Sequence, residues 1–238
     1  MTTGVRRRMG VEERRQQLIG VALELFSQRS PDDVSIDEIA SAAGISRPLV
    51  YHYFPGKLSL YEAALRRAAQ DLAGRFDEPR DGPLGDRLRR VMRRFFDFVD
   101  DHGPGFSALM RGGPAVSGGG AHTMSHVSAT NALIDSVRQA AYEQIMSHLD
   151  VTDPPPRLEL VVRSWISLAE STALIWLDGR RIPRGELETQ LVHDFAALAA
   201  VSAAYDEEMA GLLRRIVKDE PPDGPFADLV ARLLALAS

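Results

Sequence analysis

The part of the sequence best suited to chemistry is "GISRPLVYHYFPGK", residues 44 to 57. Its first glycine favours the left-handed conformation that ends one helix, and its second proline stops the next helix after about two turns. A helix this short is not stable alone, so we expect it to pack on its neighbours through Leu49, Val50 or Phe54. The polar and aromatic side chains are then left on its outer face: Ser46, Arg47, Pro48, Tyr51, His52 and Tyr53.

These side chains are of the types that bind nucleic acid. An arginine at the N-terminal end of a helix in the major groove can reach base edges. Serine and tyrosine hydroxyls can bond phosphates, which fixes the register of a protein on a duplex without reading its sequence. Lys57 adds a cation at the start of the following helix, whose free N–H groups favour a phosphate. The alternative is that the rings form a surface cluster that covers the core of a small domain.

A tight helix-turn-helix is expected to position this stretch. Ser35 and Glu38 form the S-x-x-E pattern of a capping box, and Val34 and Ile39 occupy the hydrophobic staple positions on either side. We therefore expect a second helix to begin after Ser35 and to end at the glycine of the quoted stretch. Ser46 stands only two residues beyond that glycine, where it can cap the next helix.

The longer stretch "VSIDEIASAAGISRPLVYHYFPGK" resembles the N-terminal DNA-binding domain of the tetracycline-repressor (TetR) family of bacterial transcriptional regulators. The resemblance covers residues 11 to 65. It implies a homodimer whose second short helix enters the major groove, while the aromatic pair near the end of that helix and the following lysine hold the backbone. It assigns DNA contacts to Ser35, Ser46, Arg47, Pro48, Tyr51, His52, Tyr53 and Lys57.

The sequence departs from the family's pattern in two ways. Pro48 stands where the family often has glycine, and His52 followed by Tyr53 inverts the commoner order of tyrosine and then histidine.

Charge is distributed unevenly along the 238 residues. The formal net charge is −5, but residues 1 to 75 hold eleven Lys/Arg against nine Asp/Glu, while the remainder holds seventeen against twenty-four. Only the first third is therefore suited to approach phosphate. The run Arg6, Arg7 and Arg8 is either a solvated tail or an arm that contacts the minor groove or phosphates.

The composition narrows the class of protein further. Cysteine is absent, which excludes disulfides, thiolate metal sites and cysteine nucleophiles. The N-terminal residues "MTTGVRRRMG" lack the apolar core of a signal peptide, and we find no run of about 18 apolar residues. We therefore expect a cytoplasmic protein with no membrane partner.

The apolar pattern has a helical period almost everywhere, which predicts an all-α fold. We expect an N-terminal three-helix DNA-binding domain with a helix-turn-helix and a larger C-terminal helical bundle for ligand binding and dimerisation. The expected divisions are a flexible basic arm at 1–10, the DNA-binding domain at 11–57, a connecting helix at 58–80 and the bundle at 81–238. Its helices are expected at about 86–101, 105–111, 121–149, 157–178, 184–218 and 226–237.

The segment "RLELVVRSWISLAESTALIWLDG" is apolar nearly all round, with Val161, Trp165, Leu168 and Trp176 on one side. A helix of this kind is buried on several faces, so we expect it to pack both on its own bundle and on a partner subunit. The amphipathic segment at about 184 to 203 would be its companion in a four-helix dimer interface.

A small-molecule effector is expected in the bundle. The candidate binding residues come from segments that surround the effector in the family, although ordinary core is an open alternative for each phenylalanine and methionine. Glu170 needs a partner in an otherwise apolar helix, which is either a ligand or an arginine at an interface or within the chain. The candidates are Phe95, Phe96, Phe98, Phe106, Met110, Met124, Trp165 and Glu170.

Enzyme and metal motifs are weak. His122 and His126 stand at i and i+4 but lack an evident third ligand, and "AVSGG" around Ser117 lacks the first glycine and the preceding strand of a nucleophile elbow. We therefore expect no metal, no cofactor and no enzyme. The leading hypothesis is a ligand-responsive repressor with three partners: a double-stranded DNA operator, an unknown small molecule and a second copy of itself. The alternatives are a non-catalytic helical interaction protein and, more remotely, a hydrolase built around Ser117.

Overall fold

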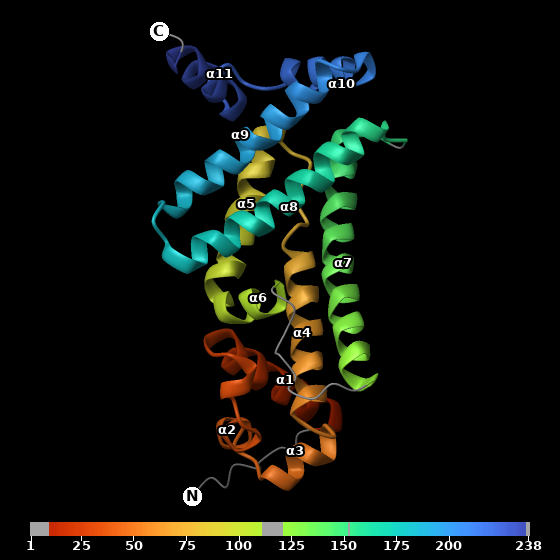
Figure 1. The fold of residues 1–238 in the computed structure, drawn as a ribbon, viewed down its shortest axis with the longest axis vertical. Helices are drawn as coiled ribbons and strands as arrows, with labels where there is room; N and C mark the ends of the chain where they lie inside the picture. The colour runs from red at the N-terminus through yellow and green to blue at the C-terminus, as the bar shows by residue number, and fades with distance from the viewer. Residues whose placement is uncertain (1–9, 111–120, 152, 237–238) are drawn as a thin grey trace, which may run out of the picture. The chain divides into compact units, whose positions relative to one another are not determined.

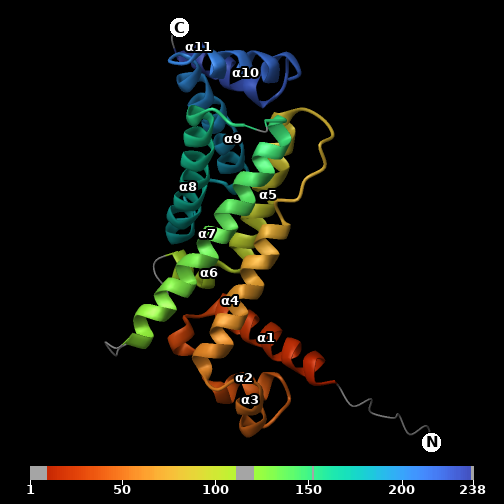
Figure 2. The same ribbon diagram turned by 90° about the vertical axis from the view of Figure 1, so that its right-hand side faces the viewer.

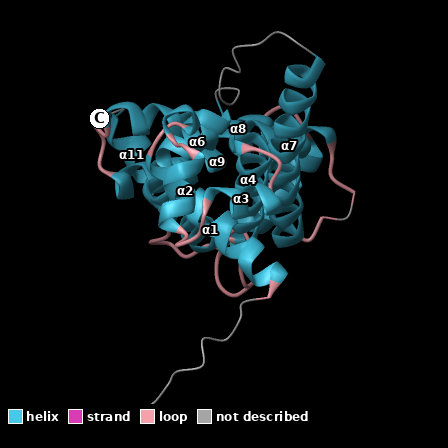
Figure 3. Cartoon of the chain, turned by 90° about the horizontal axis from the view of Figure 1, so that it is seen from below, coloured by secondary structure: helices cyan, strands magenta, loops and turns pink. Residues whose placement is uncertain are grey.

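The computed structural model describes residues 10–110, 121–151 and 153–236. Within these ranges the regular structure is helical and contains no β-strand, so the prediction of an all-α fold is confirmed (Figure 3). The elements follow in the order α1 Val11–Gln28, the 3₁₀ turn Pro31–Asp33, α2 Ile36–Ala42, α3 Arg47–Tyr53, α4 Lys57–Gly74, α5 Leu84–Asp101, α6 Gly103–Met110, α7 Ala121–Leu149, α8 Pro156–Gly179, α9 Arg184–Ala203, α10 Glu207–Lys218 and α11 Pro225–Leu236 (Figure 1).

The chain divides into two compact units. The first comprises Met1–Gln70 and His102–Leu133, and the second comprises Asp71–Asp101 and Ile134–Ser238. Helices α4 and α7 each cross the boundary between the units: the N-terminal part of each helix belongs to the first unit and its C-terminal part to the second. The two units are defined by contacts between residues, and their bounds differ from those of the expected functional domains. The functional domains remain a prediction.

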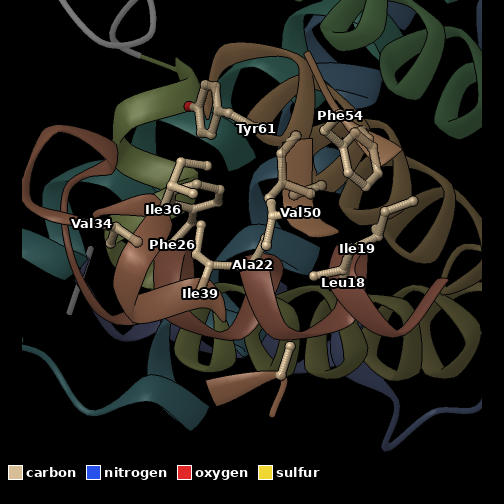
Figure 4. Close-up of a cluster of buried hydrophobic side chains, with 14 of the residues drawn as sticks. Leu18, Ile19, Ala22, Phe26, Val34, Ile36, Ile39, Val50, Phe54 and Tyr61 are labelled. Atoms are coloured by element: carbon tan, nitrogen blue, oxygen red, sulfur yellow. The ribbon is translucent and has the colours of Figure 1, made fainter. Parts of the chain in front are cut away.

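The core of the first unit is built on the apolar stripe of α1. Leu18 and Ala22 are completely buried, and Phe26 packs edge-on against Tyr61 of α4 with ring centroids 5.1 Å apart (Figure 4). Val50 of α3 and other side chains of α2 to α4 complete this cluster. Each such aliphatic or aromatic side chain contributes about 1.5 to 3 kcal/mol on burial, which holds the short helices α2 and α3 in place.

The start of α2 is fixed by the expected capping box. The Ser35 hydroxyl accepts a hydrogen bond from the Glu38 amide at 3.1 Å, and the Glu38 carboxylate accepts one from the Ser35 amide at 2.8 Å. Val34 and Ile39, at the staple positions, are 1% and 0% exposed. These local hydrogen bonds explain why the sequence located this helix end correctly.

Helix α6 packs on α1 within the first unit. The approach is close at Gly105, where an added Cβ would lie 3.1 Å from the Phe26 carbonyl oxygen. A glycine at this position therefore allows the start of α6 to lie against the end of α1.

The second unit is a bundle in which α9 packs on α5, α8, α10 and α11. Helices α8 and α9 run side by side in both ribbon views (Figure 1, Figure 2). The Trp165 indole N–H of α8 donates to the Leu191 carbonyl oxygen of α9 at 2.6 Å, and its ring packs edge-on against Phe195 at 5.3 Å. This buried donor therefore has its hydrogen-bond partner within the core.

The connecting helix expected at 58–80 ends earlier, since α4 ends at Gly74, and one expected helix is divided in two. The segment 184–218 was expected to be a single helix, but α9 ends at Ala203 and α10 begins at Glu207. Asp206 caps α10, because its carboxylate accepts a hydrogen bond from the Met209 amide at 3.0 Å. A capping aspartate competes with a continuous helix, and this signal was missed in the apolar pattern.

The faces of α8 also differ from the expected arrangement. Val161, Trp165 and Trp176 are buried, but Leu168 is 37% exposed and does not share their side. Among the described residues α8 is the only helix long and apolar enough to cross a membrane, with a mean hydropathy of 1.3 over its most apolar window. Trp165 and Trp176 of this helix are buried, and the helix packs on α9.

Candidate nucleic-acid interface

Helix α3 is anchored by two of the three expected side chains. Val50 is completely buried and Phe54, just after the helix, is 3% exposed. Leu49 is 36% exposed, so this candidate anchor was wrong. Gly44 adopts a left-handed φ of 66°, as expected for the residue that closes α2. The inward anchors and the turn together set which face of α3 is turned to solvent.

The outer face of α3 carries most of the predicted DNA-binding residues. Ser46, Pro48 and His52 are exposed, and Tyr51 is 42% exposed. Ser46 stands at the N-cap position, but its side chain makes no capping hydrogen bond, contrary to expectation. Its hydroxyl is therefore not used to close the helix end.

Tyr53 differs from the rest of this set. Its side chain is half-buried and packs against the core cluster of the first unit. The His52 ring lies edge-on to it, with centroids 5.2 Å apart. The two rings of the inverted pair thus differ in exposure: Tyr53 supports the helix from the core side, while His52 is turned outward.

Arg47 is held by one residue from each helix of the motif. Its Nη1 lies 3.1 Å from the Asp37 carboxylate of α2, and its Nη2 donates to the Tyr51 hydroxyl at 3.4 Å. The guanidinium carbon is 5.6 Å from the centroid of the Tyr51 ring. The hydrogen bond to Tyr51, followed by the charge of Asp37, raises the pKa of Arg47, which therefore remains a cation.

Two further predicted contacts lie at helix starts. The Lys57 ammonium donates to the carbonyl oxygens of Pro31 at 3.0 Å and Asp32 at 3.5 Å, so this cation also joins α4 to the 3₁₀ turn. Ser35 is exposed at the start of α2, although its hydroxyl already serves the capping box. An ammonium has three donors, so Lys57 retains capacity for a phosphate oxygen.

Asp37 is the residue of this surface that the sequence analysis missed. Its side chain is 65% exposed at the start of α2, ten positions before Arg47. An acidic residue in the first turn of a helix is ordinarily explained by the helix dipole, so its type and position gave no reason to single it out. Only the fold reveals its contact with Arg47.

The predicted effector residues are divided between the two units. Phe95, Phe96, Phe98 and Trp165 are buried in the second unit, while Phe106 is buried and Met110 half-buried in the first. Burial fits both a core and a pocket lining, so the ligand role of each stays a prediction. The side chain of Met124 lies outside the described residues.

Glu170 has its partner within the chain. Arg138 donates from Nη2 to one Glu170 oxygen at 2.7 Å and from Nε to the other at 3.0 Å. Of the two roles that the sequence left open, the structure therefore favours an intrachain arginine pair. The hydrogen bond to Glu170 raises the pKa of Arg138.

The remaining sequence candidates fall largely outside the described structure. This applies to Arg6, Arg7, Arg8 and Ser117, and to the side chains of His122 and His126. Across residues 10–110, 121–151 and 153–236, no group of three or more histidine, aspartate or glutamate side chains could hold a metal ion.

Comparison with known proteins identifies the family. Residues 18–64 match the model for bacterial regulatory proteins of the tetR family, and residues 84–198 match that for the tetracyclin repressor-like C-terminal domain. A crystal structure of a tetR-family transcriptional regulator from Streptomyces coelicolor is 81% identical, covers 96% of this chain and 99% of its own, and has a TM-score of 0.88. The chain belongs to the TetR family.

Curated transcriptional regulators match this chain over less than half of its length. The transcriptional activator FasR of Mycolicibacterium smegmatis is 36% identical over 104 residues, which are 43% of this chain and 48% of FasR. The regulator EthR of Mycobacterium tuberculosis is 31% identical over 108 residues, 44% of this chain and 48% of EthR. The chain thus spans about half the length of these curated relatives. TetR-family proteins are non-enzymatic DNA-binding regulators, which agrees with the prediction that this chain is not an enzyme.

Proposed function

We propose that the protein is a ligand-responsive repressor that binds a near-palindromic operator as a homodimer in the cytoplasm. The observation that carries the proposal is the outer face of α3, where Arg47, Tyr51 and His52 stand exposed on a helix fixed by its own core. This is the arrangement of a recognition helix, whose N-terminal residues meet base edges in the major groove. Family membership supports the same function independently.

The proposed contacts divide by their chemistry. Arg47 is the base-reading residue, because its planar guanidinium can bond a guanine with two parallel hydrogen bonds. Tyr51, Ser46, Ser35 and Lys57 are assigned to phosphates, together with Tyr53, since hydroxyls and ammonium groups position a protein without reading sequence. Pro48 and His52 lie on the same helix as Arg47 and are assigned to close contact with the groove.

The exposed faces of α8 and α9 support a homodimer. On α8, Leu160 and Ile175 are 61% and 74% exposed, and the serines 164, 167 and 171 lie between them on the same helical face. On α9 the exposed positions include Ala197, Ala200 and Val201. Uncharged and small side chains of this kind allow close helix packing, and a second copy would bury them in a four-helix interface.

The effector is assigned to the helical bundle of the C-terminal part, as is typical of the family. Within the second unit, the aromatic side chains Phe95, Phe96, Phe98 and Trp165 offer an apolar environment, which suits an apolar or amphipathic molecule. The Glu170 carboxylate is already bonded to Arg138, so it is not assigned to the ligand.

The test is DNA binding followed by regulation. The purified protein is titrated by fluorescence anisotropy against duplexes that flank its own gene, with unrelated duplexes of equal length as the control. We expect a preference for one near-palindromic flanking site, and a reporter under that site should be repressed when the protein is expressed. Equal affinity for all duplexes would rule out sequence-specific regulation. Increased reporter expression would show that the protein is an activator, as FasR is named, and not a repressor.

A further inference from the structure

Asp37, Arg47 and Tyr51 form a contact across the two helices of the motif. The Asp37 carboxylate of α2 lies 3.1 Å from Arg47 of α3, whose other terminal nitrogen donates to the Tyr51 hydroxyl at 3.4 Å. The side chains of Asp37 and Arg47 are 65% and 54% exposed. All of these groups belong to the first unit, so the contact depends on the packing of that unit alone.

We infer that Asp37 is a positioning residue that determines how specifically Arg47 reads DNA. The inference rests on the proposed DNA-binding function and adds to it a residue outside the predicted contact set. Two of the five N–H donors of a guanidinium are engaged by Asp37 and Tyr51, which fixes the plane of the group. The free donors remain sufficient for the two hydrogen bonds that select a guanine.

Stability of the fold does not explain this ion pair. Both side chains are mostly exposed, and an exposed pair contributes little to folding because water and salt screen it. A long arginine side chain that is already ordered, however, loses less conformational freedom when it binds, which favours the one base edge that matches its orientation. The contact is thus better suited to recognition than to folding.

The charge of Asp37 acts in the same direction. A carboxylate on the DNA-binding face is repelled by the phosphates of every duplex, whatever its sequence. It therefore weakens binding to non-cognate DNA while it orients the cation that recognises the cognate site. A residue that combines these two effects raises the ratio of specific to non-specific affinity.

The experiment compares Asp37→Ala with Asp33→Ala. Both variants remove one exposed negative charge from the first unit, but Asp33 lies in the 3₁₀ turn and outside the contact with Arg47. A duplex is first selected from a random library by the wild-type protein. Affinities for it and for a scrambled duplex of equal length are then measured by anisotropy, and circular dichroism verifies that each variant is folded.

We expect Asp33→Ala to strengthen binding to both duplexes alike and to leave their ratio unchanged. Asp37→Ala should strengthen binding to the scrambled duplex but not to the selected one, so the ratio falls by about tenfold. The preference should relax at one symmetric pair of base positions, those read by Arg47. In an Arg47→Ala background, Asp37→Ala should no longer change the ratio, because the residue that it positions is gone.

Two outcomes would overturn the inference and leave the proposed function intact. An unchanged ratio in Asp37→Ala would show that the carboxylate contributes charge alone. A higher ratio would show that Asp37 competes with DNA for Arg47 and acts against recognition. If the wild-type protein enriches no sequence from the library, the proposed function itself fails, and the inference with it.

Discussion

Glu38 shows how one side chain can stabilise the motif through its charge. It accepts hydrogen bonds from the amide and hydroxyl of Ser35 and pairs with Arg29 at 2.9 Å. The backbone hydrogen bond from Ser35, and then the bond from Arg29, lower the pKa of Glu38 to about 2 from the ordinary value of 4.5. The folded state therefore favours the ionised carboxylate.

The shift predicts a pH dependence of stability. Because the folded pKa of Glu38 lies below its unfolded value, its contribution is fully present above about pH 4.5 and is lost as the pH falls toward 2. Glu38→Gln should be less stable than the wild type in urea unfolding at pH 6, and the difference should narrow by pH 3. Glu24→Gln, on the exposed side of α1, is the charge-matched control. A constant difference at both pH values would contradict the assignment.

Arg47 and Lys57 separate reading DNA from holding it. If Arg47 bonds a base edge, Arg47→Ala should weaken operator binding by about 10- to 100-fold and relax the preference at one symmetric pair of positions. Lys57→Ala should weaken binding to all duplexes alike. It should also reduce the slope of log K against log salt concentration by about one per subunit, because one phosphate contact is lost. The measurement is anisotropy at several salt concentrations, and identical profiles for the two variants would remove both roles.

Thermal unfolding is the necessary control for Lys57. Its ammonium also bonds the carbonyl oxygens of Pro31 and Asp32, so part of any loss could come from a displaced 3₁₀ turn. A Lys57→Ala protein with an unchanged melting temperature isolates the phosphate contact.

What could be predicted at the scale of residues depended on sequence separation. The capping box and the left-handed Gly44 were found because their partners lie within a few positions. The bonds from Arg47 to Asp37 and from Arg138 to Glu170 span 10 and 32 positions, so only the fold shows them. For Glu170 the sequence could state that a partner is needed but not which one.

At the scale of elements, the helical pattern located most helices closely because each buries an apolar stripe. The expected helix at 121–149 matches α7, and the expected helix at 157–178 lies within one residue of α8 at each end. The missed break between α9 and α10 has a polar cause, the cap at Asp206, in a region where apolar side chains continue on both sides. Periodicity of apolar residues alone does not register such a cap.

Gly105 and Gly20 give a test of the packing of α6 on α1. Both are helical glycines, but an added Cβ meets the Phe26 carbonyl oxygen at 3.1 Å from position 105 and nothing within 4 Å from position 20. Gly20→Ala should raise the free energy of unfolding by about 0.5 to 1 kcal/mol through helix propensity. Gly105→Ala should raise the free energy of unfolding by less than Gly20→Ala does, the difference being about 1 kcal/mol or more, because the backbone of α1 must shift to admit the new methyl group.

Chemical denaturation of the two variants measures this difference. An equal gain in both would show that α6 adjusts its position freely. A smaller gain at Gly105 would show that the start of α6 packs tightly on the end of α1.

At the scale of the whole molecule, the exposed α8 face predicts dimerisation. We expect light scattering at micromolar concentration to give twice the mass of one chain, with an interface of roughly 2,000 Å² or more. Ile175→Glu places a charge on this face, where Ile175 is 74% exposed in the single chain, and should yield monomers. Val11→Glu, at a 70% exposed position of α1, is the control and should stay dimeric. A monomeric wild type would contradict the proposed assembly.

The last prediction concerns coupling between effector and operator. A repressor is induced only by a ligand that binds its two conformations with different affinity, however tightly it binds overall. Helices α4 and α7 each have one end in either compact unit, so they are the continuous elements through which a change in the bundle can reach the recognition helices. The two recognition helices of the dimer must stay about 34 Å apart to match one turn of DNA, and a small change in this distance would weaken DNA binding.

Titration of apolar and amphipathic ligands with and without the selected operator tests this coupling. Effector and operator should weaken each other by the same factor, about 5- to 150-fold, because binding free energies are linked reciprocally. The Arg47→Ala dimer is the matched control: it should bind the ligand equally well in both titrations, since it no longer engages the operator tightly. A ligand that binds the wild type with one affinity in both titrations is not the inducer. If every ligand that binds behaves in this way, induction by differential affinity is wrong and the bundle serves dimerisation alone.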